Sequence, residues 1–353
     1  MRVTLKDIAQ ATGFSMSTIS RVMRSDRYTD PDTKEKVLAA AQALNYKPDS
    51  AARRLKYGRS FVVGMVVQDI TNPFFSHAIL GAERVLHQYQ GGKYELIIAN
   101  TAAVSEREAG AITQMLQRQV EGLIVASNQT DESLAAIRRV LKSGVPVVSV
   151  DNDLGSGKID VVGVDSFDGT AVLTRHLIEA GHKRIAIIAG PQTESHARAR
   201  LEGFKSALKE GGLKVHRPLV REGDWEPSSG YTITAGWIAK SLVPDAILAC
   251  NNFMGMGALS AIRDANLAVP DDIALATFDD VEFGHLIRPG LTTLKYSWED
   301  IGARAADLLL ARLEGKESMS AAQRRVEVPF ELLVRESCGA GLRNDVRPQQ
   351  ARR

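Results

Sequence analysis

The sequence predicts a small all-helical unit followed by a larger α/β domain built on parallel sheets. The chain has 353 residues, which is more than a single hydrophobic core usually organises. Short helical patterns fill residues 1–47. From Phe61 onward, short apolar runs alternate with amphipathic helical patterns, as is typical of parallel sheets covered on both faces.

The composition is that of a folded globular chain. Hydrophobic residues make up 44% and charged residues 24%, which excludes a disordered or collagen-like chain. No apolar run approaches the roughly 18 residues that span a bilayer, and Lys6 and Asp7 stand where a signal peptide would be apolar. Cys250 and Cys338 form no metal-binding pair. We therefore expect a cytoplasmic protein with no membrane partner, no metal and no cofactor.

Positive charge is concentrated at the front of the chain. Residues 1–60 carry 12 Lys or Arg against 6 Asp or Glu, although the whole chain has a net charge of only +2. A basic front ahead of a slightly acidic body suits a polyanionic partner for the front alone. A solvated surface gives the same excess more often, so charge by itself does not assign a function.

Two short helices joined by a glycine turn are expected at the front. The Thr4 hydroxyl can cap a first helix that ends at about Thr12, and Gly13 can adopt the tight turn that follows. Ser15 can then cap a second helix over Met16–Met23.

A third helix is expected to pack on the first two. Asp30-Pro31 supplies its cap and first-turn proline, and an apolar stripe follows at Val37, Ala40, Ala41 and Leu44. This arrangement is typical of a helix-turn-helix, whose second helix enters the major groove of DNA. The spacing fits a plain three-helix bundle equally well, so both interpretations stay open at this point.

The exact amino-acid sequence of the segment distinguishes the helix-turn-helix from a plain three-helix bundle. VTLKDIAQATGFSMSTISRVM, with TKEKVLAAAQALNYKPDSAARRLKYGRS after it, resembles the LacI family of sugar-responsive repressors nearly residue for residue. The resemblance implies a DNA-binding domain at residues 1–47, a hinge helix and linker at 48–60, and a homodimer on double-stranded operator DNA. The DNA contacts that it implies in the first domain are Thr4, Leu5, Ser15, Met16, Ser17, Thr18 and Arg21.

These side chains read bases weakly. Met16 can make only apolar contact, for instance with a thymine methyl group, and Ser17 accepts several hydrogen-bonding partners. Arg21 is the strongest single reader or phosphate contact. The sequence therefore leaves the operator largely undefined.

The hinge is expected to order only on DNA. Asp49–Lys56 is eight residues long, which is too short for a stable helix in water without partners. By resemblance, Leu55 is the apolar wedge in the minor groove, Ala52 lies close to the same groove, and Arg53 contacts phosphates.

The body from 61 to 335 is expected to form two lobes. Eight strand-like runs divide near Gly163, and the resemblance implies a periplasmic-binding-protein-like (type I) domain for effector binding and dimerisation. We expect lobe 1 at about 61–163 and 293–324, and lobe 2 at about 164–292 and 325–335. The tail, 336–353, has no leucine heptad and is expected to be flexible, which favours a dimer over a tetramer.

Polar and aromatic residues at the ends of these runs suggest a ligand site. Ligands of open parallel sheets bind at the carboxyl ends of strands. Carboxylates and amides there can bind hydroxyl groups, a guanidinium can hold two neighbouring oxygens, and flat rings can cover C–H faces, as a sugar requires. The candidates, which the resemblance supports, are Asn72, Phe74, Asp151, Arg198, Trp225, Asn251, Asp279, Tyr296 and Trp298.

Two departures from the family pattern affect the identity of the ligand. Asn251-Asn252 replaces the Asn-Asp of many members, and Tyr296 with Trp298 makes the crossover unusually aromatic. A nucleobase would use the same aromatic residues, so that effector stays open.

The sequence favours a repressor of carbohydrate-utilisation genes that leaves its operator when a small sugar binds between the lobes. A corepressor-type effector is an open alternative. An enzyme is disfavoured because no GxGxxG after a strand, P-loop, HExxH or GxSxG motif is present, and His77 and His196 have no marked nucleophile beside them. A periplasmic sugar receptor would share the body but not the basic front.

Overall fold

The computed structural model describes residues 3–23, 30–46, 59–318 and 321–340. The chain divides into two compact units, Met1–Ser60 and Phe61–Arg353.

The first unit is a three-helix cluster. Its helices are α1 (Leu5–Thr12), α2 (Met16–Val22) and α3 (Pro31–Ala43). Their cap residues fix where they begin, because Ser15 Oγ accepts from Thr18 N–H and an Asp30 carboxylate oxygen accepts from Thr33 N–H. Gly13 adopts a φ of 74° between the first two helices, as the predicted turn requires. Ile8, Ile19, Val22, Val37 and Ala41 form the buried core.

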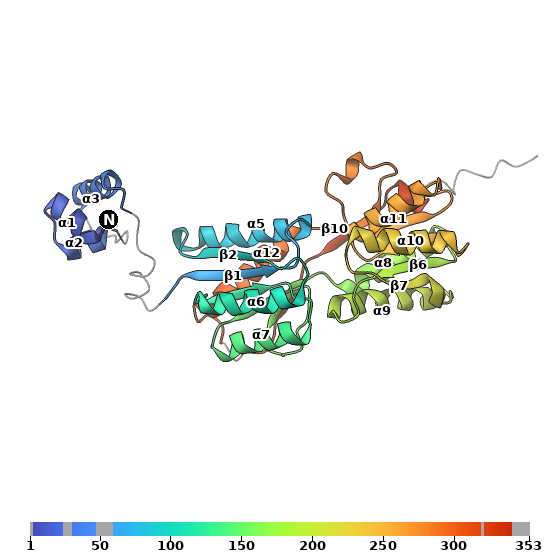
Figure 1. Cartoon of the computed structure of the whole chain (residues 1–353), viewed down its shortest axis with the longest axis horizontal. Helices are drawn as coiled ribbons and strands as arrows, with labels where there is room; N and C mark the ends of the chain where they lie inside the picture. The colour runs from blue at the N-terminus through green and yellow to red at the C-terminus, as the bar shows by residue number, and fades with distance from the viewer. Residues whose placement is uncertain (1–2, 24–29, 47–58, 319–320, 341–353) are drawn as a thin grey trace, which may run out of the picture. The chain divides into compact units, whose positions relative to one another are not determined.

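The second unit contains two sheets, one in each lobe (Figure 1). In its described part the sheet of lobe 1 has the order β11-β5-β4-β3-β1-β2, and that of lobe 2 has the order β12-β10-β9-β8-β6-β7. Within them, only the β10–β12 pair is antiparallel. The lobe 1 strands are β1 (Val62–Val67), β2 (Glu95–Asn100), β3 (Gly122–Val125), β4 (Val147–Val150), β5 (Asp160–Gly163) and β11 (Arg325–Glu327). The lobe 2 strands are β6 (Ile185–Ala189), β7 (Val220–Glu222), β8 (Ala246–Ala249), β9 (Ala274–Asp279), β10 (Thr292–Tyr296) and β12 (Phe330–Leu333).

Helices cover both faces of each sheet (Figure 1). In lobe 1, α5 (Pro73–Gln88) and α12 (Trp298–Leu313) pack on one face, and α6 (Ser105–Gln117) and α7 (Asp131–Lys142) pack on the other. In lobe 2, α8 (Ser166–Glu179) pairs with α9 (Ser195–Glu210), and α10 (Pro227–Ala239) pairs with α11 (Asn252–Asp264). Strands buried on both sides explain why their sequences are continuously apolar rather than alternating.

The chain crosses between the lobes three times, slightly later than the sequence suggests. β10 pairs with β9 and β12, so residues 293–296 belong to lobe 2 rather than to lobe 1. Arg325–Glu327 pairs with β5 and belongs to lobe 1 rather than to lobe 2. Short apolar runs can pair in either sheet, so their partners are set by the tertiary structure.

A buried ion pair joins β5 of lobe 1 to α12 and to the segment that leads into β11. Asp160 is fully buried, and its carboxylate accepts from Arg312 Nε at 2.8 Å and Nη2 at 2.6 Å. Arg324 contributes its backbone N–H at 2.8 Å and Nη2 at 2.9 Å. Burial acts to raise the pKa of Asp160, but the hydrogen bonds from Arg312 and Arg324 outweigh it and lower that pKa.

The first residues of the predicted flexible tail are packed against lobe 2. Glu336–Cys338 forms a short 3₁₀ helix, and Ser337 and Cys338 are fully buried. Ser337 Oγ donates to the Leu275 carbonyl, and His182 Nε2 lies 2.8 Å from the Cys338 carbonyl oxygen. The expectation of flexibility is therefore wrong for this part, because its buried polar groups are satisfied by lobe 2. Residues 341–353 lie outside the described part of the chain.

Candidate functional site

The second helix of the first unit exposes the residues expected to face DNA. Ile19 and Val22 point into the core, whereas the Met16 side chain is 48% exposed and Ser17 and Arg21 are exposed as well. Ser15 Oγ lies 2.7 Å from Ser17 Oγ and 2.9 Å from Thr18 Oγ1, so the three hydroxyls form one polar cluster at the start of α2.

The two remaining contacts expected in this unit lie at the start of α1. Thr4 is exposed, and its backbone N–H and hydroxyl both donate to Asp7. Leu5 is partly buried and packs on the helical core. The expected hinge contacts, Ala52, Arg53 and Leu55, lie outside the described residues.

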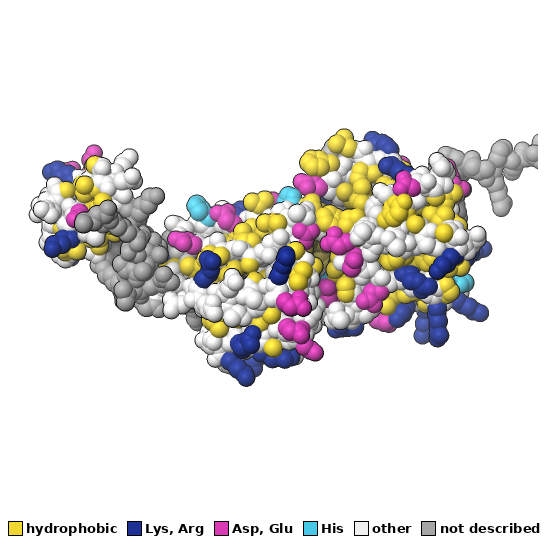
Figure 2. Space-filling view, in the orientation of Figure 1, with side chains coloured by type: hydrophobic (Ala, Val, Ile, Leu, Met, Phe, Trp, Pro, Cys, Tyr) yellow, Lys and Arg dark blue, Asp and Glu magenta, His cyan; other side chains and the backbone are white. Residues whose placement is uncertain are grey.

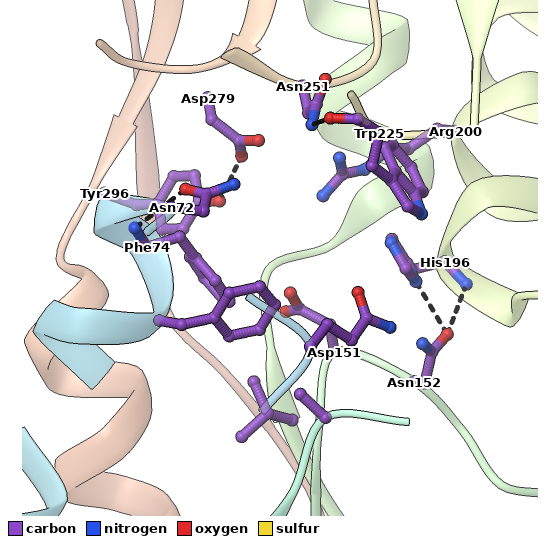
Figure 3. Close-up of a pocket in the computed structure, with 14 residues that line it drawn as sticks. Asn72, Phe74, Asp151, Asn152, His196, Arg200, Trp225, Asn251, Asp279 and Tyr296 are labelled. Atoms are coloured by element: carbon purple, nitrogen blue, oxygen red, sulfur yellow. Dashed lines mark hydrogen bonds between the residues drawn. The ribbon is translucent and has the colours of Figure 1, made fainter. Parts of the chain in front are cut away.

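In the second unit, a cavity lies where the carboxyl ends of strands from both lobes meet (Figure 3). Lobe 1 contributes the segment after β1, the start of α5 and the end of β4, and lobe 2 contributes α9, the loop before α10 and the ends of β8, β9 and β10. Its lining residues are Gln68, Asn72, Phe74, Phe75, Ala126, Val150, Asp151, Asn152, His196, Arg200, Trp225, Asn251, Asp279 and Tyr296.

Two carboxylates face one guanidinium in this cavity. Burial raises the pKa of Asp151 to about 7, with Arg200 acting to lower it and Asp279 to raise it further. Burial also raises the pKa of Asp279, against the opposing charge of Arg200. The Tyr296 hydroxyl donates to Asp279 at 2.5 Å. Burial thus removes water from both carboxyl groups, and hydroxyl groups of a ligand could replace that water.

The protein holds the Arg200 side chain in place from three sides. Its guanidinium carbon lies 3.6 Å from the centre of the Phe278 ring. Nη1 donates to the Cys250 carbonyl oxygen, and Nε lies 3.5 Å from Ser166 Oγ. A guanidinium carries five N–H donors, so these two contacts leave donors for a ligand.

Aromatic residues form the walls. Phe74 and Phe75 meet edge to face with ring centres 5.0 Å apart. Trp225 stacks on His196 at 5.0 Å, and its Nε1–H donates to Glu194. Burial lowers the pKa of His196 well below its usual value, aided by Arg200 and Arg198. A neutral ring at this position can therefore stack without bringing a second positive charge.

Two of the predicted residues adopt a left-handed backbone. Asp151 has φ 61° and Trp225 has φ 72°, in a region that non-glycine residues seldom occupy. Such strain persists where the surrounding structure enforces it, and it is concentrated at functional sites.

The two asparagines act as helix caps at the cavity. Asn72 Oδ1 accepts from Phe74 N–H at 3.1 Å and so begins α5. Asn251 Oδ1 accepts from Met254 N–H, and its Nδ2 donates to the Trp225 carbonyl oxygen at 2.8 Å. Asn251 thereby fixes the strained backbone of Trp225.

Two predicted residues do not line the cavity. Arg198 is exposed, and its Nη1 donates to the carbonyl oxygens of Gln192 and Thr193. Arg200 takes its place, because it lies four residues after His196 and so on the same face of α9. Trp298 lies beyond Tyr296, beside His77 at 5.6 Å. Sequence reasoning missed Arg200 and Asn152, and for Arg200 the helical spacing from His196 was the available signal.

Neither a metal site nor a membrane span is found in the parts of the chain that the structure describes. Within them, Asp, Glu, His and Cys form no group suited to a metal ion. None of the helices in those parts is both long and apolar enough to cross a bilayer.

Family models match both units of the chain. Residues 4–49 match the model described as bacterial regulatory proteins, lacI family, and residues 174–338 match the periplasmic binding protein-like domain. The HTH-type transcriptional repressor PurR of Haemophilus influenzae (strain PittEE) is 35% identical over 335 residues, covering 95% of this chain and 98% of that protein. The ribose operon repressor of Escherichia coli (strain K12) is 34% identical over 310 residues, covering 88% and 93%.

Solved structures give the same result. The lac repressor dimer bound to operator and the anti-inducer ONPF matches with a TM-score of 0.83 and 28% identity, covering 96% of this chain and 99% of that chain. A complex of the transcriptional regulator CelR with cellobiose matches with a TM-score of 0.71 and 28% identity, covering 95% and 100%. The predicted fold class is confirmed, and the relatives are regulators rather than enzymes. The chain belongs to the lacI family of bacterial regulatory proteins and is a DNA-binding transcriptional regulator.

Proposed function

We propose that this regulator is a homodimeric repressor that binds operator DNA through α2 and releases it when an uncharged sugar enters the cavity between the lobes. The exposed Met16, Ser17 and Arg21 of α2 support the DNA contact. The dimer is proposed by analogy with the lac repressor, which forms one on its operator. The hinge of each subunit would then meet that of its partner on the DNA.

The proposal of a sugar effector rests on the opposed charges in the cavity. Asp151 and the buried Asp279 present carboxyl groups to the cavity, and Arg200 presents a fixed guanidinium that acts on both of them. Hydroxyl groups of a sugar donate to carboxylates and accept from a guanidinium, so one polyol satisfies all three groups.

The surroundings of the cavity disfavour an anion. On the face shown in Figure 2, acidic side chains gather along the line where the lobes meet. Burial raises the pKa of Glu226, and Asp69 and Asp224 raise it further, so these three acids lie close enough to repel one another. A sugar phosphate would add further negative charge to these acidic surroundings. The cellobiose in the complex of CelR is an uncharged sugar, which agrees with this choice.

The geometry supports control through lobe closure. Ligand groups that contact both lobes stabilise the arrangement in which those lobes are close, and the three crossover segments allow their relative angle to change. A change in that angle would separate the two hinges of a dimer and lower operator affinity. We propose this inducing sign rather than corepression.

A thermal-shift panel tests the effector class. Full-length protein is screened against neutral monosaccharides and disaccharides, the phosphates of the same sugars, and nucleobases. We expect stabilisation by a neutral sugar and none by its phosphate. Stabilisation by a nucleobase alone would overturn the sugar assignment.

Gel-shift titration of operator DNA with the stabilising sugar then tests the sign. Weaker DNA binding is expected, and tighter binding would show corepression. A variant lacking residues 1–58 should lose operator binding yet keep the thermal shift, and retained DNA binding would refute the assignment of the first unit.

A further inference from the structure

The start of α9 is held by the opposite lobe. Ser195 and His196 open this helix in lobe 2, and their backbone N–H groups donate to Gln129 Oε1 and Asn152 Oδ1 of lobe 1. Ser195 Oγ also donates to Asn152 Oδ1 at 3.0 Å and accepts from Asp153 N–H at 2.8 Å. Lobe 1 thus satisfies N–H groups that a helix start leaves unpaired.

Glu194 lies at the centre of this contact. It precedes α9 and is only 2% exposed. One carboxylate oxygen accepts from Trp225 Nε1–H of lobe 2 at 3.1 Å, and the other accepts from Asn152 Nδ2–H of lobe 1 at 3.3 Å. A side-chain hydrogen bond from Gln68 of lobe 1 also reaches it. The same acid therefore touches the wall of the cavity and the facing lobe.

We propose that Glu194 is a positioning residue that joins the Trp225 wall of the effector cavity to lobe 1, so that its protonation state regulates lobe closure. This inference concerns the regulation of the proposed effector site and in that respect rests on the proposed function. It adds a residue and a regulating proton that the sugar-binding proposal does not contain.

The electrostatic surroundings of Glu194 determine whether lobe closure strengthens or weakens as the pH rises. Burial raises the pKa of Glu194 to about 7, and the hydrogen bonds from Trp225 and Asn152 only partly offset it. When the lobes separate, water reaches the carboxyl group and its pKa returns toward the ordinary 4.5. The closed form therefore binds the proton more tightly, so closure is favoured at low pH and weakens as the pH rises through 7.

Other titrating groups must be separated from this one. His196 lies 3.6 Å from Glu194 and acts with the opposite sign, because burial lowers the pKa of its ring, whereas Asp151 acts in the same direction as Glu194. Only the difference between the wild type and a variant at Glu194 isolates its contribution. The titratable groups placed directly around Glu194 are Glu108, which acts to raise its pKa, His196, and Asp224 and Glu226, which line the same pocket. One step further out, Asp69 acts on Glu226, Asp153 binds Ser195, Arg198 and Arg200 act on His196, and Asp151 lines the cavity beside His196.

The size of the effect follows from the two pKa values. With about 7 in the closed form and 4.5 in the open form, the closure equilibrium constant falls about tenfold between pH 6 and pH 8. Glu194→Gln mimics the protonated acid and removes this contribution. The variant should close as readily at pH 8 as at pH 6, apart from the share of the other groups.

The first test needs no ligand. The ¹H–¹⁵N signals of the tryptophan indoles are followed with pH in the full-length protein, and the Trp225 signal is assigned from its loss in Trp225→Phe. We expect a step near pH 7 in the wild type and no such step in Glu194→Gln. The Trp237 and Trp298 indoles report whether each variant is folded. Glu202→Gln, an exposed acid on the same helix, is the matched control and should keep the step.

The second test measures closure itself. Labels are placed at Glu132→Cys in α7 and Lys209→Cys in α9, both exposed, in dimers diluted with unlabelled partner. The closed fraction should fall with pH more steeply in the wild type than in Glu194→Gln, by up to tenfold between pH 6 and pH 8. Equal pH responses, or an indole step that survives in Glu194→Gln, would overturn the inference. Both readouts omit sugar, so failure of the sugar proposal would leave them unaffected.

Discussion

Replacing Gly190 with alanine should displace Trp225 and weaken sugar binding without unfolding the protein. Gly190 follows β6, and a Cβ atom built on it would lie 2.0 Å from Cη2 and Cζ2 of the Trp225 ring. Carbon atoms without a bond between them approach to about 3.5 Å, so the ring must move by about 1.5 Å. Such a shift is enough to break the 3.1 Å hydrogen bond from Trp225 to Glu194.

The loss can be estimated from the role of the ring. Contact with one well-placed aromatic ring contributes about 0.5–1.5 kcal/mol to binding, so we expect affinity for the sugar to fall about twofold to tenfold. The backbone of Gly190 is not in the left-handed region, so alanine itself fits there without strain. Global stability should therefore change much less than sugar affinity does.

Calorimetric titration with the sugar that gives the largest thermal shift measures the effect. Gly236→Ala is the matched control, because it lies in α10 and a Cβ built there meets no atom within 4 Å. It should bind the sugar like the wild type. Operator affinity without sugar should also be unchanged in Gly236→Ala. If Gly190→Ala bound the sugar as tightly as the wild type, Trp225 would not be part of the effector site.

Three further changes test the DNA contact, the fold and the cavity. Arg21→Ala should weaken operator binding on all sequences and lower the slope of log affinity against log salt concentration by about one, as measured by gel shift over a salt series. The control, Arg139→Ala at an exposed position of α7, should leave both quantities unchanged. Asp160→Asn should lower the free energy of unfolding in urea by about 3 kcal/mol or more, since it leaves the buried Arg312 without its charged partner. Because the pKa of Asp160 is lowered in the folded protein, its contribution to stability is full above pH 4 and is lost as the pH falls further. If Asp160→Asn lowered the free energy of unfolding equally at pH 7 and pH 3, the stabilising ion pair would be refuted. Asp279→Asn should reduce sugar affinity by about tenfold to a hundredfold through loss of a charged acceptor, with the exposed Asp168→Asn as control, and an unchanged affinity would remove Asp279 from the site.

Local chemistry made the helical unit predictable. The helix starts at Leu5, Met16 and Pro31 agree with the caps expected at Thr4, Ser15 and Asp30, because a cap acts on amide groups within three residues of itself. The eight strand-like runs also form strands, since continuous apolar runs of this length are typical of sheets covered on both faces, although β2 at the sheet edge is partly exposed. Sequence could therefore define the fold class and the edge of the sheets where ligand would bind.

Sequence did not define which side chains reach the cavity. Arg198 and Arg200 are two residues apart on α9, and the helix turns by more than half a circle between them. Only packing against lobe 2 shows that Arg200 is buried under Phe278 and that Arg198 is exposed. Packing also separates Trp298 from the cavity. Tyr296, the last residue of β10, lines the cavity, whereas Trp298 does not.

The sequence by itself therefore determined the order of the elements, the helix caps and the exposed face of α2, because all of these depend on neighbours along the chain. The tertiary structure alone decided the partners of β10 and β11, the choice of Arg200, and the meeting of Glu194 with Asn152. These contacts join residues 15 to 164 positions apart or depend on helix rotation, and short-range patterns carry no information about either.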